Sequence, residues 1–139
     1  MDQTVQECQG LLKKALTGNA LFSVISGVAI LIANRWLVKF LGLPDKVSLV
    51  LLGISLIIYS VLLWLNARKA KIIITGAWVA IVMDVVWVVG SYALIVVVPF
   101  SVGGKWVVAV VAELVLAFAV LQWMGVRRVL KSGRYASTV

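Results

Sequence analysis

Residues 72–98 read IIITGAWVAIVMDVVWVVGSYALIVVV, an apolar run interrupted near its centre by a single charge, Asp84. A transmembrane helix needs about 20 predominantly apolar residues to cross a hydrocarbon core of about 30 Å. This run exceeds that length, and it is bounded by Lys71 on one side and by Pro99 on the other. The stretch therefore predicts a membrane-spanning helix that carries a carboxyl group within the lipid and either tilts or ends before Pro99.

The other charges divide the chain into three further intervals of similar length. Positions 15–34 and 47–67 carry no charge, and positions 106–126 carry only Glu113. Apolar residues make up 63% of the 139-residue chain and charged residues 13%, against about 45–50% and about 25% in soluble domains. We therefore predict an all-α integral membrane protein that forms a four-helix transmembrane bundle in a single membrane domain of residues 1–139.

The predicted spans lie near residues 15–33, 47–66, 72–98 and 106–126. A soluble protein with four buried helices is the alternative, but most of its helices would need a polar face, and these segments are apolar nearly all round.

Basic residues are shared unevenly between the two ends of the predicted bundle. Nine lie at the end that carries both termini: Lys13, Lys14, Arg68, Lys69, Lys71, Arg127, Arg128, Lys131 and Arg134. Four lie at the other end: Arg35, Lys39, Lys46 and Lys105. Because positive charge is retained on the cytoplasmic side, both termini are expected in the cytoplasm, with the protein in a bacterial inner membrane and residues 127–139 as a short basic tail.

The basic residues of that tail, Arg127, Arg128, Lys131 and Arg134, are candidates for contact with anionic lipid headgroups. The alternative is ordinary anchoring by positive charge at the inner surface. At the other end of the chain, Val5, Cys8, Leu12 and Ala15 recur at helical spacing. This pattern predicts either a segment lying along the inner membrane surface or a frayed start of the first helix.

A shift of 59 residues overlays the second predicted helix on the fourth. Tyr59 then matches Phe118, Trp64 matches Trp123, and a pair of basic residues follows each tryptophan. The pattern favours two tandem helical hairpins of the same orientation. Alternatively, aromatic residues at the membrane surface and basic helix ends create the match in unrelated helices.

Small and polar side chains recur at helical spacing on three of the predicted helices, as in the interior of a membrane bundle. With Glu113 of the fourth helix added, the expected intramembrane polar cluster is Asn19, Ser23, Ser26, Ser55, Tyr59, Asp84, Trp87, Ser91 and Glu113.

At 1.5 Å per residue, Ser26 and Tyr59 are expected at the depth of Asp84, and Glu113 nearer to Ser55. Asp84 is expected to face the interior, within hydrogen-bond reach of the first or second helix, because an ionisable group is costly in lipid. Simple helix packing is the alternative explanation for the serines.

The sequence offers little for catalysis. It has no histidine and a single cysteine, Cys8, and it lacks the common catalytic and phosphate-binding motifs. We therefore expect no enzyme, no metal site, no cofactor and no nucleic-acid partner. Metal-free proton transfer within the membrane is the one catalytic exception.

Two functions remain. The first expectation is an accessory, assembly or interaction subunit of a membrane complex, whose polar stripes bind other membrane helices or a second copy of the chain. The alternative is a small proton- or cation-coupled permease or channel-like protein in which Asp84 is the coupling site. The lipid bilayer is the expected partner in both.

Overall fold

The computed structural model describes the backbone of residues 2–136 and the side-chain environment of residues 6–133, and the regular secondary structure of this part is all α-helix. Its helices are α1 (Asp2–Leu41), α2 (Val47–Ala67), α3 (Ile74–Val97) and α4 (Val102–Ala136). All four are long and apolar enough to cross a membrane. The predicted all-α bundle of four apolar helices is confirmed.

Large apolar side chains cover the outer surface of the bundle. Ile32 on α1 is 81% exposed and Val96 on α3 is 84% exposed, and similar residues face outward from α2 and α4. A water-soluble monomer rarely exposes so much contiguous apolar surface. The exposed surface thus agrees with lipid as the surrounding solvent.

The first and last helices are longer than the predicted spans. At 1.5 Å per residue, the 40 residues of α1 extend about 60 Å and the 35 residues of α4 about 50 Å, well beyond the hydrocarbon thickness. Residues before position 15 continue α1 without a break, so they form neither a separate surface segment nor a frayed start. Likewise, residues 127–136 continue α4.

Both extensions are held by packing against each other. Leu12 and Ala15 are buried, and the backbone of Leu12 lies so close to Gly125 that a Cβ there would sit 2.9 Å from the Leu12 Cα. Glycine thus permits the close approach of α1 and α4.

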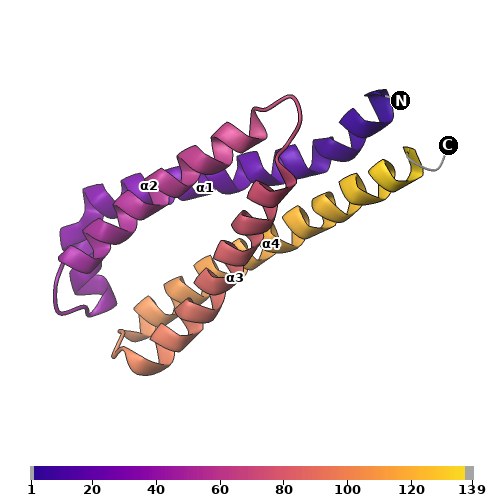
Figure 1. The fold of residues 1–139 in the computed structure, drawn as a ribbon. Coiled ribbons are helices and arrows are strands. Elements are labelled where there is room, and N and C mark those ends of the chain that lie inside the picture. The colour runs from indigo at the N-terminus through magenta and orange to yellow at the C-terminus, as the bar shows by residue number, and fades with distance from the viewer. Residues whose placement is uncertain (1, 137–139) are drawn as a thin grey trace.

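The chain forms two antiparallel hairpins, α1–α2 and α3–α4, whose loops lie at the same end of the molecule (Figure 1). We call this the loop end and the opposite end, where α1 begins and α4 finishes, the terminal end. At the loop end α1 stops because Gly42 adopts a left-handed φ of 76°. The Ser101 amide then donates to the Leu41 carbonyl at 3.0 Å and ties the two loops together.

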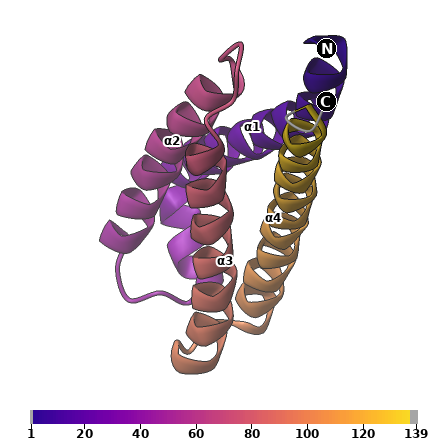
Figure 2. The same cartoon turned by 45° about the vertical axis from the view of Figure 1, so that its right-hand side comes forward.

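Helix packing is uneven around the bundle. α1 packs along both α2 and α4, and α3 packs along α4, whereas α2 and α3 make few contacts. Figure 2 shows α3 and α4 running side by side, with α1 passing behind α3. Gly27 and Gly53 bring α1 and α2 together, since a Cβ on Gly27 would lie 2.8 Å from the Gly53 carbonyl oxygen.

The buried apolar core lies toward the terminal end. It includes Leu12 and Leu16 of α1, Leu63 of α2 and Val126 of α4. α2 and α3 are joined there by Asn66, whose side chain exchanges hydrogen bonds of 3.0 and 3.2 Å with the backbone of Ile73. The bundle is therefore closed at the terminal end. α2 and α3 separate from each other toward the loop end.

The two hairpins share one local feature at the position of the proposed repeat. The Arg68 guanidinium lies 5.9 Å from the centroid of the Trp64 ring, and that of Arg127 lies 4.7 Å from the centroid of the Trp123 ring. Each pair joins an aromatic to a cation one helical turn later. Origin of the hairpins by duplication stays a prediction.

Candidate functional site

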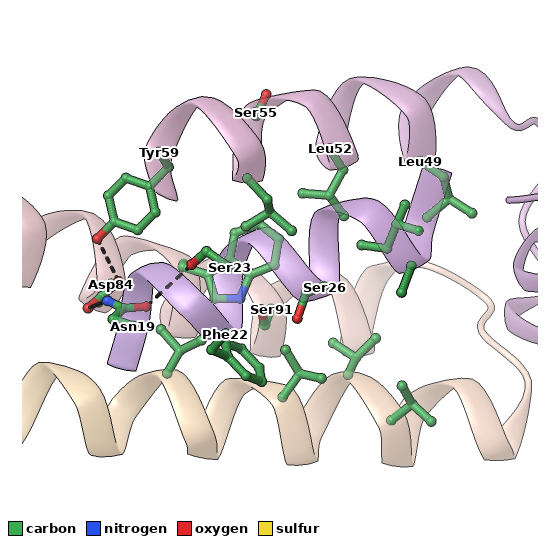
Figure 3. A pocket seen from close by; sticks show the side chains of 18 of the residues that line it. Asn19, Phe22, Ser23, Ser26, Leu49, Leu52, Ser55, Tyr59, Asp84 and Ser91 are labelled. Carbon is green, nitrogen blue, oxygen red and sulfur yellow. Dashed lines mark hydrogen bonds between the residues drawn. The ribbon is translucent and has the colours of Figure 1, made fainter. Parts of the chain in front are cut away.

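Asp84 receives a hydrogen bond from each of the other three helices. Its side chain is only 2% exposed. The Asn19 amide of α1 donates to its Oδ2 at 2.7 Å, and the Gln122 amide of α4 donates to the same oxygen at 2.8 Å. The Tyr59 hydroxyl of α2 donates to its Oδ1 at 2.8 Å (Figure 3). One carboxyl group of α3 is thus the shared acceptor for all of its neighbours.

Two further contacts extend this polar cluster. The Ser23 hydroxyl donates to Asn19 Oδ1 at 3.4 Å, which leaves the Asn19 amide nitrogen free to face Asp84. The Tyr59 hydroxyl also lies 3.1 Å from the Ala80 carbonyl oxygen. Gln122 is fully buried, and its Oε1 has no hydrogen-bond partner among the described residues.

The geometry accommodates the Asp84 carboxyl with or without its proton. The ionised group accepts three hydrogen bonds. A hydroxyl has one proton and two acceptor lone pairs, so Tyr59 can donate to Asp84 or to the Ala80 carbonyl, but not to both at once. If Asp84 carries a proton on Oδ1, that proton can be donated to the Tyr59 oxygen while Tyr59 donates to Ala80. Neither state leaves the hydroxyl or the two amide donors without a partner.

A cavity of about 410 Å³ begins at this cluster. It runs from Asp84 and Asn19 to Leu41 and Leu49 near the loop end, and side chains from all four helices form its walls. Most of the lining residues are apolar, with leucine and valine the most frequent of these. The cavity therefore combines a long apolar section with one polar end.

The cavity lining includes exposed residues of α2 and α3. Ser55 of α2 and Met83 of α3 both line the cavity and are both exposed on the outside of the bundle. These two helices make few contacts with each other, and we infer that the cavity opens between them. In a bilayer the opening would face lipid.

The structure brings together most of the polar residues selected from the sequence. Asn19, Ser23, Tyr59 and Asp84 form the cluster, in agreement with the expectation that Asp84 faces the interior near the first two helices. Further along the cavity lie Ser26, Ser55, Trp87 and Ser91.

Two details of the expected arrangement are wrong. Asn19, and not Ser26, lies at the level of Asp84, because α1 begins far outside the predicted span and is shifted relative to α3. The hydroxyl of Ser55 donates to the Leu51 carbonyl of its own helix at 2.8 Å and points away from the cavity (Figure 3).

Glu113 does not join the cluster. Its side chain is exposed on the outside of α4, where it accepts a hydrogen bond from the Tyr92 hydroxyl of α3. The expectation that Glu113 belongs to the intramembrane polar cluster is therefore wrong. Depth along a helix was estimated from the sequence, but the rotation of α4 about its axis decides which side chain faces inward.

Gln122 is the functional candidate that sequence reasoning missed. It falls near the end of the predicted fourth span, a position that indicated the membrane surface. A signal was present, because Gln122 is the only amide side chain in residues 106–126. Since α4 continues to Ala136, this residue lies well inside the helix and reaches Asp84.

The candidates for lipid headgroup contact lie where α4 extends toward the terminal end. Arg127, Arg128 and Lys131 are exposed there. The side chain of Arg134 lies outside the described residues. Contact with headgroups stays a prediction.

Comparison with known proteins and the search for metal ligands add no further candidate. Among residues described by the structure, no three His, Cys, Asp or Glu side chains gather closely enough to hold a metal ion. No protein-family model, curated protein or solved structure matches the chain.

Replacing Asp84 tests whether its carboxyl group supports the bundle. Asp84→Leu removes an insertion penalty of roughly 2.5–3.5 kcal/mol. It also leaves the buried amides of Asn19 and Gln122 without their acceptor, at a cost of about 1–3 kcal/mol each, while Tyr59 can still donate to the Ala80 carbonyl. We expect Asp84→Leu to lower the free energy of unfolding in detergent by about 1–3 kcal/mol. Asp84→Asn, which keeps an acceptor oxygen, should lose less than about 1 kcal/mol.

Glu113→Leu is the matched control, because it removes a carboxyl group from the exposed surface. Its unfolding free energy should stay within about 0.5 kcal/mol of that of the unmodified protein. An Asp84→Leu protein that resists chemical denaturation better than the unmodified protein would show that the carboxyl is merely tolerated.

Proposed function

We propose that the chain is a small membrane permease that binds an amphiphilic cation in the cavity and exchanges it for a proton at Asp84. The supporting observation is the position of Asp84, which is the only acidic residue among those lining a largely apolar cavity. The sequence alone favours an accessory subunit. We prefer a permease because the cavity offers a volume for a ligand, with a polar end at Asp84 and mostly apolar walls elsewhere.

The size and lining of the cavity suit a small molecule. Ligand sites typically enclose about 300–1,000 Å³ and combine apolar walls with a few polar groups, and this cavity has about 410 Å³. A polar head fits the end of the cavity at Asp84, and an apolar tail fits the section that extends from there toward Leu41 and Leu49. The lateral opening between α2 and α3 provides entry from the lipid.

Charge balance explains why exchange for a proton is reasonable. A buried carboxylate without a counter-charge is costly in a membrane, whereas a protonated carboxyl or a carboxylate paired with a cation is much less so. When a ligand cation enters, Asp84 releases its proton and the net charge in the cavity stays the same. Tyr59 then turns its hydroxyl proton from the Ala80 carbonyl to Asp84.

An accessory role in a membrane complex is the second candidate. One observation favours it: the carboxyl group of Glu113 faces outward from the bundle at a depth within the span of α4. Such a group suits contact with another protein better than contact with lipid.

We further propose that both termini are cytoplasmic and that the membrane is a bacterial inner membrane. Nine of the 13 basic residues belong to the terminal end, and positive charge is retained inside. A reporter that fluoresces only in the cytoplasm, fused after Val139, should be active. A reporter of the opposite compartment that is active at this position would reverse the orientation.

Transport measurements test the proposed exchange. Purified protein in liposomes with an acidic lumen should take up an alkyltrimethylammonium ion, whose fixed charge prevents it from crossing as a neutral molecule. A pH-sensitive dye inside should report the accompanying loss of protons. Asp84→Asn should reduce both signals to the level of protein-free liposomes, because an amide cannot release a proton.

Glu113→Gln serves as the control, since it alters a carboxyl group outside the cavity and should leave both signals intact. Equal uptake by the unmodified protein and Asp84→Asn, or no uptake by either, would refute the exchange.

A further inference from the structure

Tyr92 and Glu113 form a polar pair on the outside of the α3–α4 hairpin. The Tyr92 hydroxyl donates to the Glu113 carboxyl group. Tyr92 is 42% exposed, and Glu113 is also exposed. Neither residue lines the cavity. The pair is therefore a separate feature from the Asp84 cluster and has no role in the proposed exchange.

The position of Glu113 makes this exposure costly in a bilayer. It lies seven residues, about 10 Å, inside the predicted span 106–126, and its partner Tyr92 lies about 12 Å along α3 from Asp84 toward the loop end. The pair therefore lies within the apolar span on the loop-end side of Asp84. Acidic side chains at this depth usually face protein or water, and they usually pair with another group.

The two helices that carry the pair provide no cation beside Glu113. α3 contains no basic residue, and the nearest ones along α4 are Lys105 and Arg127. Lys105 lies eight residues away, about 12 Å along the axis, where its long side chain reaches toward the membrane surface. A cation that pairs with Glu113 at this depth would therefore come from another molecule.

The surface around the pair can receive a helix. Val89 and Val96 flank Tyr92 on the same face of α3, and Val110 and Ala117 flank Glu113 on α4. All four are exposed. Short side chains such as these allow helix backbones to approach closely, and close packing is a main source of helix association in membranes.

We propose that this surface docks a transmembrane helix of another protein, with a lysine or arginine of that helix paired to Glu113. Charge complementarity favours such a partner over a second copy of this chain. A second copy would bring another Glu113 and a Tyr92 hydroxyl whose proton is already donated. The carboxyl group fixes the depth of the partner, and the valine and alanine surface provides the packing.

A designed peptide can serve as the partner in the test. It is a tryptophan-free leucine- and alanine-rich transmembrane helix with one central arginine, and its matched control has leucine there. A dansyl group on each peptide reports binding in liposomes through energy transfer from the tryptophans of the protein. We expect the arginine peptide to bind roughly three- to thirtyfold more tightly than the leucine peptide, the range for one polar contact in a membrane.

Glu113→Gln should reduce this preference severalfold, whereas Glu7→Gln, the same change at an exposed site outside the predicted spans, should retain it. Asp84→Asn should also retain it, so that loss of transport and loss of docking remain separate results. Equal binding of the two peptides to the unmodified protein would overturn the proposal. So would an arginine preference that survives Glu113→Gln, or Glu113-dependent self-association that excludes the peptide.

Discussion

A buried carboxyl group needs hydrogen-bond donors, and in this protein the donors come from three different helices. Asn19, Tyr59 and Gln122 all contact Asp84. Lipid cannot supply an alternative donor, so separating any of these helices from α3 leaves polar groups without partners. The relative positions of the four helices at this level depend on that requirement. The aliphatic side chains around the cluster can pack in many helix arrangements. Only a few arrangements provide the carboxyl group with hydrogen-bond donors.

This cluster also separates two regions of different character. Toward the terminal end, Leu12, Leu16 and Val126 fill the interior. Toward the loop end, α2 and α3 diverge and the cavity occupies the space between the hairpins. Asp84 lies at the boundary, where it faces the cavity and also holds the closed part together. A change of its protonation or hydrogen-bond partner would therefore alter contacts of all four helices, which suits the proposed exchange.

The sequence was sufficient for the number and character of the helices, because charge-free intervals and the thickness of a bilayer determine both. It also placed Asp84 correctly, since the cost of exposing a carboxyl to lipid depends little on detail. It failed where the outcome depends on helix rotation and offset. Glu113 faces outward although it is nearly as costly as Asp84, and Asn19 replaces Ser26 because α1 extends further than its apolar span. Gln122 was missed because helix length was estimated from hydropathy, while packing between α1 and α4 extends both helices.

The most direct test of the shared-acceptor arrangement is a double-mutant cycle between Tyr59→Phe and Gln122→Leu, measured by chemical unfolding in detergent. The two residues contact different oxygens of Asp84, and α2 and α4 do not pack along each other. If Asp84 links them, the double variant should lose less free energy of unfolding than the two single losses combined, by about 0.5–3 kcal/mol. That difference should vanish when Asp84 is replaced by leucine. Losses that add within about 0.3–0.5 kcal/mol would contradict the account, because the four helices would then be held in place independently of this carboxyl group.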